Sequence, residues 1–176
     1  MIMIFLEVEH IYAMLRIPLV ALLLTFSFTC IGQAQEETIR TFNPGSYQQI
    51  LSEHTGKPFM LAIWSIDCPS CLKDMAVLRA IHEKHPDLKI VMLSTDEPIA
   101  LPEVKDILTK HQLTELENWI FGADDAQKLR YEIDPRWYGE LPRTYFFTAS
   151  HSRTGKSGIL KIEELEEQIA NISMKP

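Results

Sequence analysis

The sequence predicts a single α/β domain in which helices cover a central, mostly parallel β-sheet. Short apolar runs, typical of strands that are buried on both faces, alternate along the chain with segments whose apolar residues recur at helical spacing. The length of 176 residues suits one domain with its own hydrophobic core. The sequence shows no repeat and no internal linker.

The first 34 residues differ from the rest of the chain. From Met14 the sequence has one arginine, an apolar stretch and then small and polar residues up to Ala34, which is the order of a secretory signal. Acidic residues before Met14 suit such a signal poorly, so Met14 is a possible true start. We expect residues 1–34 to be a signal peptide and residues 35–176 to be an exported, periplasmic domain. The alternative is an uncleaved N-terminal membrane anchor.

The first half of the domain is expected to contain a short helix, a buried strand and a longer helix. A helix over residues 46–54 ends at Gly56. Residues 58–64 are continuously apolar, which indicates a strand covered on both faces. The segment that starts at Cys68 has apolar residues at helical spacing until Pro86 ends it.

The middle of the chain repeats this alternation. Residues 88–95 are a second apolar run and predict a second buried strand. Residues 101–113 predict a helix with a proline in its first turn, and residues 118–122 predict a short strand. Residues 124–133 predict a helix, because acidic side chains at its start interact favourably with the helix dipole.

The last part of the chain is expected to form a hairpin and a terminal helix. Residues 142–150 predict a strand with a proline at its first position, where the missing N–H is tolerated. Residues 151–158 are interpreted as a turn and residues 159–161 as a possible short strand. Residues 162–171 are amphipathic and predict the final helix.

Cys68 and Cys71 are separated by two residues at the start of the longest predicted helix. Pro69 suits the first helical position, where its missing N–H costs nothing. Free N–H groups and the positive end of the helix dipole favour the thiolate of Cys68, and Cys71 lies one turn further on, where it can resolve a mixed disulfide. A purely structural disulfide over so short a loop would remove little chain entropy. Zinc needs four ligands, and the sequence has no second pair.

Two stretches of this sequence resemble the thioredoxin-like superfamily. "KPFMLAIWSIDCPSC" is similar to its active-site strand and helix, and "ELPRTYFFTA" is similar to its later strand, which begins at a cis-proline facing the cysteines. The spacing of these stretches and the export signal resemble the TlpA/ResA branch of secreted thiol-disulfide proteins. The resemblance implies a cis Leu141–Pro142 bond, a docking role for the backbone of Leu141, and a position for Trp64 beside the cysteines. It implies no cofactor and no metal.

Two positions depart from the pattern of that superfamily. Asp67 stands where many members have a tryptophan, and its charge opposes the thiolate of Cys68. Thioredoxin also keeps a buried acid at the position of Ala62, so another carboxylate or water must carry the proton of Cys71. Glu140, close to Pro142, is one candidate.

The expected function is the reduction of protein disulfides by an exported dithiol. The resemblance implies protein disulfide substrates, apocytochrome c among them in cytochrome c maturation, and a membrane thiol reductant. The formal net charge of −7 and the lack of basic clusters argue against nucleic acid. The alternatives are a disulfide-forming oxidant and a non-enzymatic copper-carrying or docking module. Trp137 and Tyr138 are interpreted either as a partner-docking rim or as local packing.

Overall fold

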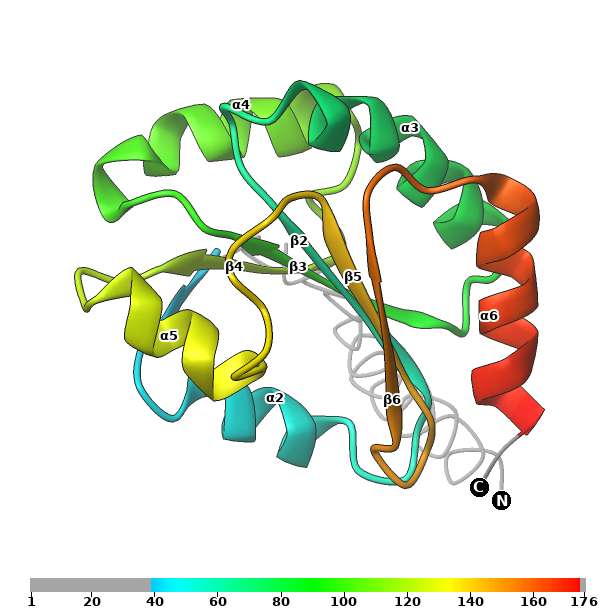
Figure 1. Ribbon diagram of the computed structural model, residues 1–176. Coiled ribbons are helices and arrows are strands. Elements are labelled where there is room, and N and C mark those ends of the chain that lie inside the picture. The colour runs from blue at the N-terminus through cyan, green and yellow to red at the C-terminus, as the bar shows by residue number, and fades with distance from the viewer. Residues whose placement is uncertain (1–38, 175–176) are drawn as a thin grey trace, which may run out of the picture. The chain divides into compact units, whose positions relative to one another are not determined.

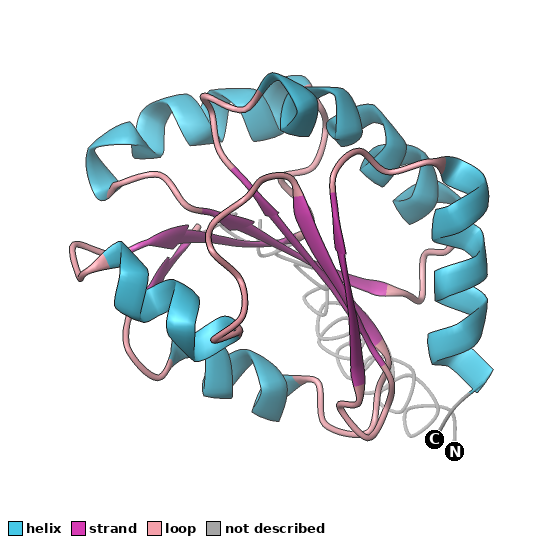
Figure 2. Cartoon of the chain, in the orientation of Figure 1, coloured by secondary structure: helices cyan, strands magenta, loops and turns pink. Residues whose placement is uncertain are grey.

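The computed structural model describes residues 39–174, so the predicted signal peptide lies outside the described residues. The predicted α/β fold is confirmed, with a six-stranded mixed sheet in the order β1-β4-β3-β2-β5-β6 (Figures 1 and 2). Strands β1 to β4 pair in parallel, whereas β5 runs antiparallel to both β2 and β6. The strands are β1 Arg40–Phe42, β2 Phe59–Trp64, β3 Lys89–Ser94, β4 Glu117–Phe121, β5 Arg143–Phe147 and β6 Arg153–Ser157.

Helices cover both faces of the sheet (Figure 1). Helices α3, α4 and α6 supply buried side chains to the core on one face, and α2 and α5 supply those on the other. No helix within residues 39–174 is long and apolar enough to cross a membrane. The helices are α2 Ser46–Glu53, α3 Pro69–Lys84, α4 Leu101–Lys110, α5 Ala126–Ile133 and α6 Ile162–Met174, with a 3₁₀ turn η1 at Pro98–Ala100.

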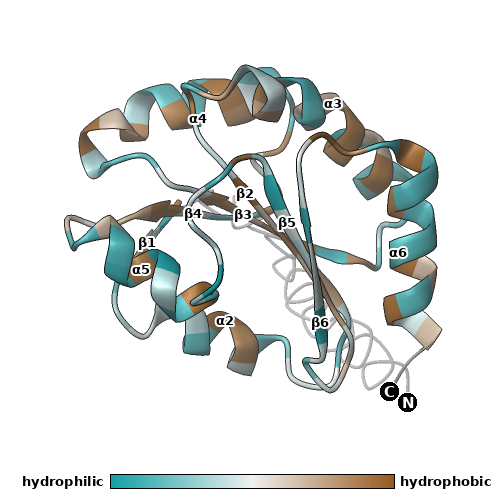
Figure 3. Cartoon of the chain, viewed as in Figure 1, coloured by the Kyte–Doolittle hydropathy of each residue, from teal (hydrophilic) through white to brown (hydrophobic). Residues whose placement is uncertain are grey.

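Strand β2 separates the two cores, which explains its continuously apolar sequence. Successive side chains of a strand point to opposite faces, so Met60 and Trp64 pack with α3, while Phe59 and Ile63 pack with α2 and α5. All six residues of β2 are buried. The central strands are accordingly among the most hydrophobic parts of the ribbon in Figure 3.

The structure corrects the expected hairpin near the C-terminus. Residues 153–157, which we interpreted as part of a turn, form the edge strand β6, and the turn closes earlier, between Thr148 and Ser152. An edge strand is hydrogen-bonded on one side and can be polar, so the sequence Arg-Thr-Gly-Lys-Ser has no apolar signal. Residues 159–161 form no strand, because the N–H of Leu160 donates to the carboxylate of Asp74 instead of to the sheet.

Candidate active site

The candidate site lies where the ends of β2, β3 and β6 meet the start of β5. The last residue of β2, Trp64, pairs with Ser94 at the end of β3, and Ile63 pairs with Arg143 at the start of β5. Arg143 also pairs with Ser157, the last residue of β6. We call this side of the domain the cysteine end of the sheet. In α/β folds, the carboxyl ends of parallel strands are the usual position of a functional site.

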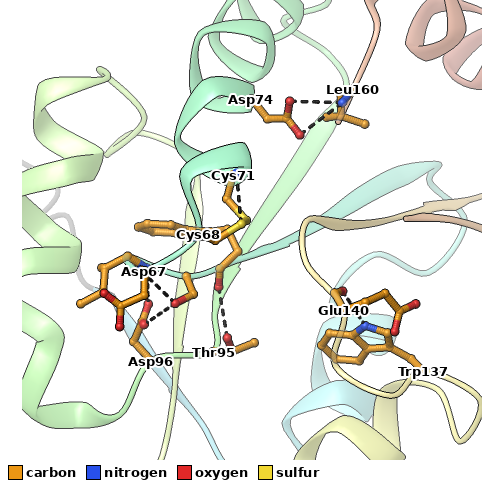
Figure 4. The surroundings of a disulfide bond; sticks show 12 residues. Asp67, Cys68, Cys71, Asp74, Thr95, Asp96, Trp137, Glu140 and Leu160 are labelled. Carbon is orange, nitrogen blue, oxygen red and sulfur yellow. Dashed lines mark hydrogen bonds between the residues drawn. A yellow bond between two sulfur atoms is a disulfide. The ribbon is translucent and has the colours of Figure 1, made fainter. Parts of the chain in front are cut away.

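The two cysteines open α3 at the cysteine end and are joined by a disulfide (Figure 4). Cys68 is the N-cap of α3 and Pro69 occupies its first turn. The backbone N–H of Cys71 donates to Sγ of Cys68 over 3.1 Å, which is the interaction that would stabilise a thiolate there. Cys71 is buried and Cys68 is half-buried, so Cys68 is the sulfur that a partner can reach.

The Leu141–Pro142 peptide bond is cis, which confirms the expectation for this position. Pro142 is buried, and its carbonyl accepts the N–H of Gly158 over 2.9 Å. Leu141 is half-buried and packs against both hydrophobic cores, and one of these cores contains Cys71 and Trp64. The contact between the ring of Pro142 and the sulfur atoms stays a prediction.

A carboxylate that the sequence analysis missed holds the segment in front of Cys68. Asp96, just beyond β3, accepts hydrogen bonds from Oγ of Ser65 at 2.7 Å and from the N–H of Ile66 at 3.0 Å (Figure 4). Oγ of Ser94 also donates to it over 2.5 Å. Asp67, in contrast, is exposed, and its N–H donates to Oγ of Ser65. The sequence signal for Asp96 was an acidic residue directly after a predicted buried strand. The segment that it binds lies about 30 residues earlier in the chain, so the sequence alone did not connect the two.

Comparison with known proteins points to one fold. No protein-family model and no curated protein matches this sequence. Among solved structures, DsbF from MTB superimposes with a TM-score of 0.58 at 18% identity, over 69% of this chain and 85% of that one. A secreted Mycobacterium tuberculosis disulfide oxidoreductase homologous to E. coli DsbE gives a TM-score of 0.56 at 20% identity, over 68% and 85% of the two chains. A thioredoxin-like protein in its oxidised form gives 0.52 at 21%, over 66% and 77%.

The chain has the thioredoxin-like fold. Its expected hallmarks lie together at the cysteine end, namely the cysteine pair at the start of α3 and the cis bond before β5. Trp64 is 3% exposed at the last position of β2 and belongs to the same core as Cys71. Its contact with the cysteine pair stays a prediction. Among residues 39–174, no three His, Cys, Asp or Glu side chains gather in a way that could hold a metal ion.

One buried acid, Asp74, lies on α3. Asp74 is 3% exposed, and its two carboxylate oxygens accept the N–H of Leu160 at 3.1 and 3.2 Å (Figure 4). Burial raises the pKa of Asp74, and the hydrogen bond from Leu160 opposes this shift. Asp74 lies three residues beyond Cys71 on α3, and positions three apart share a helix face. The sequence signal for a buried Asp74 was its position at helical spacing from apolar residues of α3 that are themselves buried.

Glu140 does not fit the proton-transfer role that we considered for it. Its carboxylate accepts a hydrogen bond from Oγ of Ser157 over 2.8 Å and lies 3.5 Å from the guanidinium of Arg143, and its side chain is 49% exposed. The carboxylate of Glu140 therefore binds Ser157 and Arg143 at the solvent-exposed surface of the domain. The buried Asp74 is the better candidate for the acid that Ala62 does not supply.

We predict that Asp74→Asn stabilises the domain at neutral pH. Because burial raises the pKa of Asp74, the folded chain holds this proton more tightly than the unfolded chain. The contribution of Asp74 to stability is therefore fully present below its unfolded pKa of about 3.9 and is lost as pH rises through the folded pKa. The amide oxygen of asparagine can still accept the N–H of Leu160. Urea titrations should show equal free energies of unfolding at pH 3 and a more stable variant at pH 7.

The matched control for this prediction is Asp87→Asn, which removes an exposed carboxylate from the loop after α3. The comparison separates the effect of burial from the change in net charge, because both variants lose one acidic group. A stability difference between Asp74→Asn and the parent chain that does not change between pH 3 and pH 7 would contradict the assignment of a raised pKa to Asp74.

Proposed function

We propose that this chain is an exported thiol-disulfide oxidoreductase that reduces protein disulfides through Cys68 and Cys71. The observation that carries the proposal is the geometry of the pair, in which a reachable sulfur at a helix start is backed by a buried one. The cis Leu141–Pro142 bond lies at the same end of the sheet. The resemblance supports a role for the backbone of Leu141 in pairing with a substrate strand. The resemblance to the TlpA/ResA branch supports export and a periplasmic location.

The proposed reaction moves two electrons from the dithiol to the substrate. The thiolate of Cys68 attacks one sulfur of the substrate disulfide, forms a mixed disulfide, and releases the other substrate sulfur as a thiolate that takes up a proton. Cys71 then gives up its proton, with Asp74 as the nearest buried acceptor on α3, and attacks Sγ of Cys68. The second substrate thiol leaves, and the disulfide between Cys68 and Cys71 remains. A membrane thiol reductant returns the pair to the dithiol.

The acidic surroundings of Cys68 favour the direction of reduction. Asp67 precedes the cysteine in the chain, and the carboxylate of Asp96 is hydrogen-bonded to the adjacent loop. Negative charge near a thiolate raises its energy, which destabilises the reduced form and makes the dithiol a stronger reductant. The N–H of Cys71 and the helix start act in the opposite sense.

We predict that Asp67→Asn lowers the pKa of Cys68 by about one unit, equivalent to ~1.4 kcal/mol. Because the reduced form gains stability, the disulfide of the variant should also be more oxidising. The pKa is measured by the pH dependence of thiolate absorbance or alkylation in the reduced protein. Glu97→Gln, which removes another exposed carboxylate beyond β3, is the control. An unchanged pKa in Asp67→Asn would show that the Asp67 charge does not act on the thiolate.

The reduction potential tests the proposed direction. We expect equilibration with dithiothreitol or glutathione to give a potential below about −200 mV, together with turnover of a disulfide-bonded protein. A value near the −120 mV of a strong oxidant would indicate disulfide formation instead. Failure to cycle any disulfide would remove the enzymatic proposal and leave a copper-carrying or docking module. Reduction of disulfide-bonded apocytochrome c tests the proposed role in cytochrome c maturation.

Export is tested separately. We propose that residues 1–34 are removed and that the mature chain begins at Gln35, outside the cytoplasm. N-terminal sequencing of the protein recovered from the periplasm should give this residue. Recovery of a chain that keeps residues 14–34, in the membrane fraction, would support the anchored alternative.

A further inference from the structure

Residues 65–67 connect the end of β2 to Cys68, the N-cap of α3. We call residues 65–67 the cysteine loop. The loop belongs to neither the sheet nor the helix, so regular backbone hydrogen bonds do not fix its conformation. The position of Sγ of Cys68 therefore depends on the individual contacts that the loop makes.

Two residues, Ser65 and Asp96, accept the consecutive N–H groups that lead to the reactive sulfur. The N–H of Ile66 donates to the carboxylate of Asp96 over 3.0 Å, and the N–H of Asp67 donates to Oγ of Ser65 over 3.2 Å. The N–H of Cys68 donates to the backbone carbonyl of Ser65, also over 3.2 Å. A loop whose successive donors all have partners is held in one conformation, because another conformation would leave donors unpaired.

The carboxylate of Asp96 joins the cysteine loop to the end of β3 (Figure 4). Oγ of Ser65 donates to one carboxylate oxygen over 2.7 Å, and Oγ of Ser94, the last residue of β3, donates to the other over 2.5 Å. The N–H of Thr95 donates to the carbonyl of Trp64 over 2.9 Å, which closes the connection before the loop begins. Hydrogen bonds to an ionised carboxylate are about twice as strong as those between neutral groups, so Asp96 is the main attachment of the loop.

This attachment matters most in the reduced protein. In the oxidised chain the disulfide to Cys71 restrains Cys68 covalently, and reduction removes that restraint. Reduction removes none of the hydrogen-bond donors or acceptors of the cysteine loop. The N–H of Cys71 stabilises a thiolate at Cys68 as long as Sγ stays at the start of α3, where the two atoms are 3.1 Å apart. The loop contacts therefore hold the sulfur in place during the state that attacks a substrate.

We propose that Asp96 is a positioning residue that, through Ser65 and Ile66, keeps the thiolate of Cys68 at the start of α3. This inference rests on the proposed function and concerns the same site. The hydrogen bonds of Asp96 and its charge act in opposite senses, because the bonds hold Sγ near a donor whereas the negative charge raises the energy of a nearby thiolate. Variants that keep one property and remove the other therefore separate the two effects.

The first comparison is between Asp96→Asn and Asp96→Ala, which lose the same charge. Asparagine keeps an oxygen for the N–H of Ile66 and an amide that can pair with Oγ of Ser65, whereas alanine keeps neither. The pKa of Cys68 is measured in the reduced protein from the pH dependence of its alkylation by iodoacetamide, with mass spectrometry of the peptides to identify the modified cysteine. This pKa should be about one unit higher in Asp96→Ala than in Asp96→Asn. Thermal unfolding checks that each variant is folded under the conditions of the measurement.

The second comparison, between Ser65→Ala and Ser94→Ala, leaves the charge of the chain unchanged. Both hydroxyl groups donate to Asp96, but only Ser65 belongs to the cysteine loop. Ser65→Ala should raise the pKa of Cys68 and lower kcat/KM for disulfides about 5- to 10-fold, and Ser94→Ala should keep both values. The loss should be equal on a disulfide-bonded protein and on glutathione disulfide, because the contact is with the loop of the attacking sulfur.

Three results would overturn the positioning role of Asp96. These are an equal pKa of Cys68 in Asp96→Asn and Asp96→Ala, equal behaviour of Ser65→Ala and Ser94→Ala, and a loss of thermal stability in Asp96→Ala without any change in the pKa of Cys68. Alkylation requires no disulfide substrate, so it tests the positioning role independently of turnover. Inactivity of the parent chain on every disulfide, with the expected pKa differences intact, would overturn the proposed function and support the positioning role.

Discussion

Cys71→Ser should accumulate a mixed disulfide with protein substrates, whereas Cys68→Ser should trap none. Cys68 is the half-buried N-cap of α3 whose sulfur accepts the N–H of Cys71, so we expect it to be the sulfur that attacks. Cys71 is 1% exposed and can act only on a sulfur already held at Cys68. Both variants should lose multiple turnover completely, because each reaction needs both thiols.

Trapping is measured by incubating each variant with a disulfide-bonded protein and separating the products on a non-reducing gel. The double variant Cys68→Ser with Cys71→Ser is the control for complexes that form without these thiols. Equal amounts of mixed disulfide with the two single variants would contradict the assignment of Cys68 as the attacking thiol and Cys71 as the resolving thiol. The relative positions of the two sulfurs would then not decide which one reacts first.

Trp137→Ala should lower the free energy of unfolding by about 3–5 kcal/mol, the usual cost of removing a large buried aromatic side chain. Trp137 is 4% exposed and packs in the core formed by β2, α2 and α5. Its Nε1 also donates to the carbonyl of Glu140, two residues before the cis bond. The side chain therefore supports the loop that leads to Pro142, and we expect substrate reduction to fall as well.

Urea titration measures the loss in free energy of unfolding. Two further variants separate the contribution of packing from that of the hydrogen bond. Trp137→Phe keeps most of the packing but removes the hydrogen bond to Glu140, so it should cost about 1 kcal/mol beyond its smaller cavity term. Tyr138→Ala removes the exposed neighbouring ring and should change stability by no more than about 0.5 kcal/mol. Similar losses for Trp137→Ala and Tyr138→Ala would contradict the assignment of Trp137 to the core.

Most of the secondary structure could be predicted because its signals are local. The run at β2 is apolar throughout because both of its faces are buried, and this property can be read without knowing the neighbouring strands. Cys68 and Pro69 mark the start of α3 through capping and through the fixed φ of proline, which depend on adjacent residues alone. The alternation of such segments was sufficient for the α/β class.

Elements that depend on distant partners could not be predicted in this way. Strand β1 is only three residues long, and it forms a strand because it pairs with β4. Strand β6 is polar and exposed, and it is defined by its register with β5. Neither segment has enough apolar residues for periodicity to indicate a strand, since the free energy of their pairing comes mainly from hydrogen bonds to another part of the chain.

The sequence by itself determined the position of the cysteine pair, the order of strands β2 to β5 and of the helices around them, and, by resemblance, the cis bond at Pro142. The tertiary structure alone decided which partners the carboxylates of Asp96 and Asp74 bind. Asp96 reaches the loop before Cys68, and Asp74 is buried against Leu160, across sequence separations of 30 and 86 residues. Hydrogen bonds of this kind form only when sheet register and helix packing bring the partners within about 3 Å, and no local pattern encodes that approach.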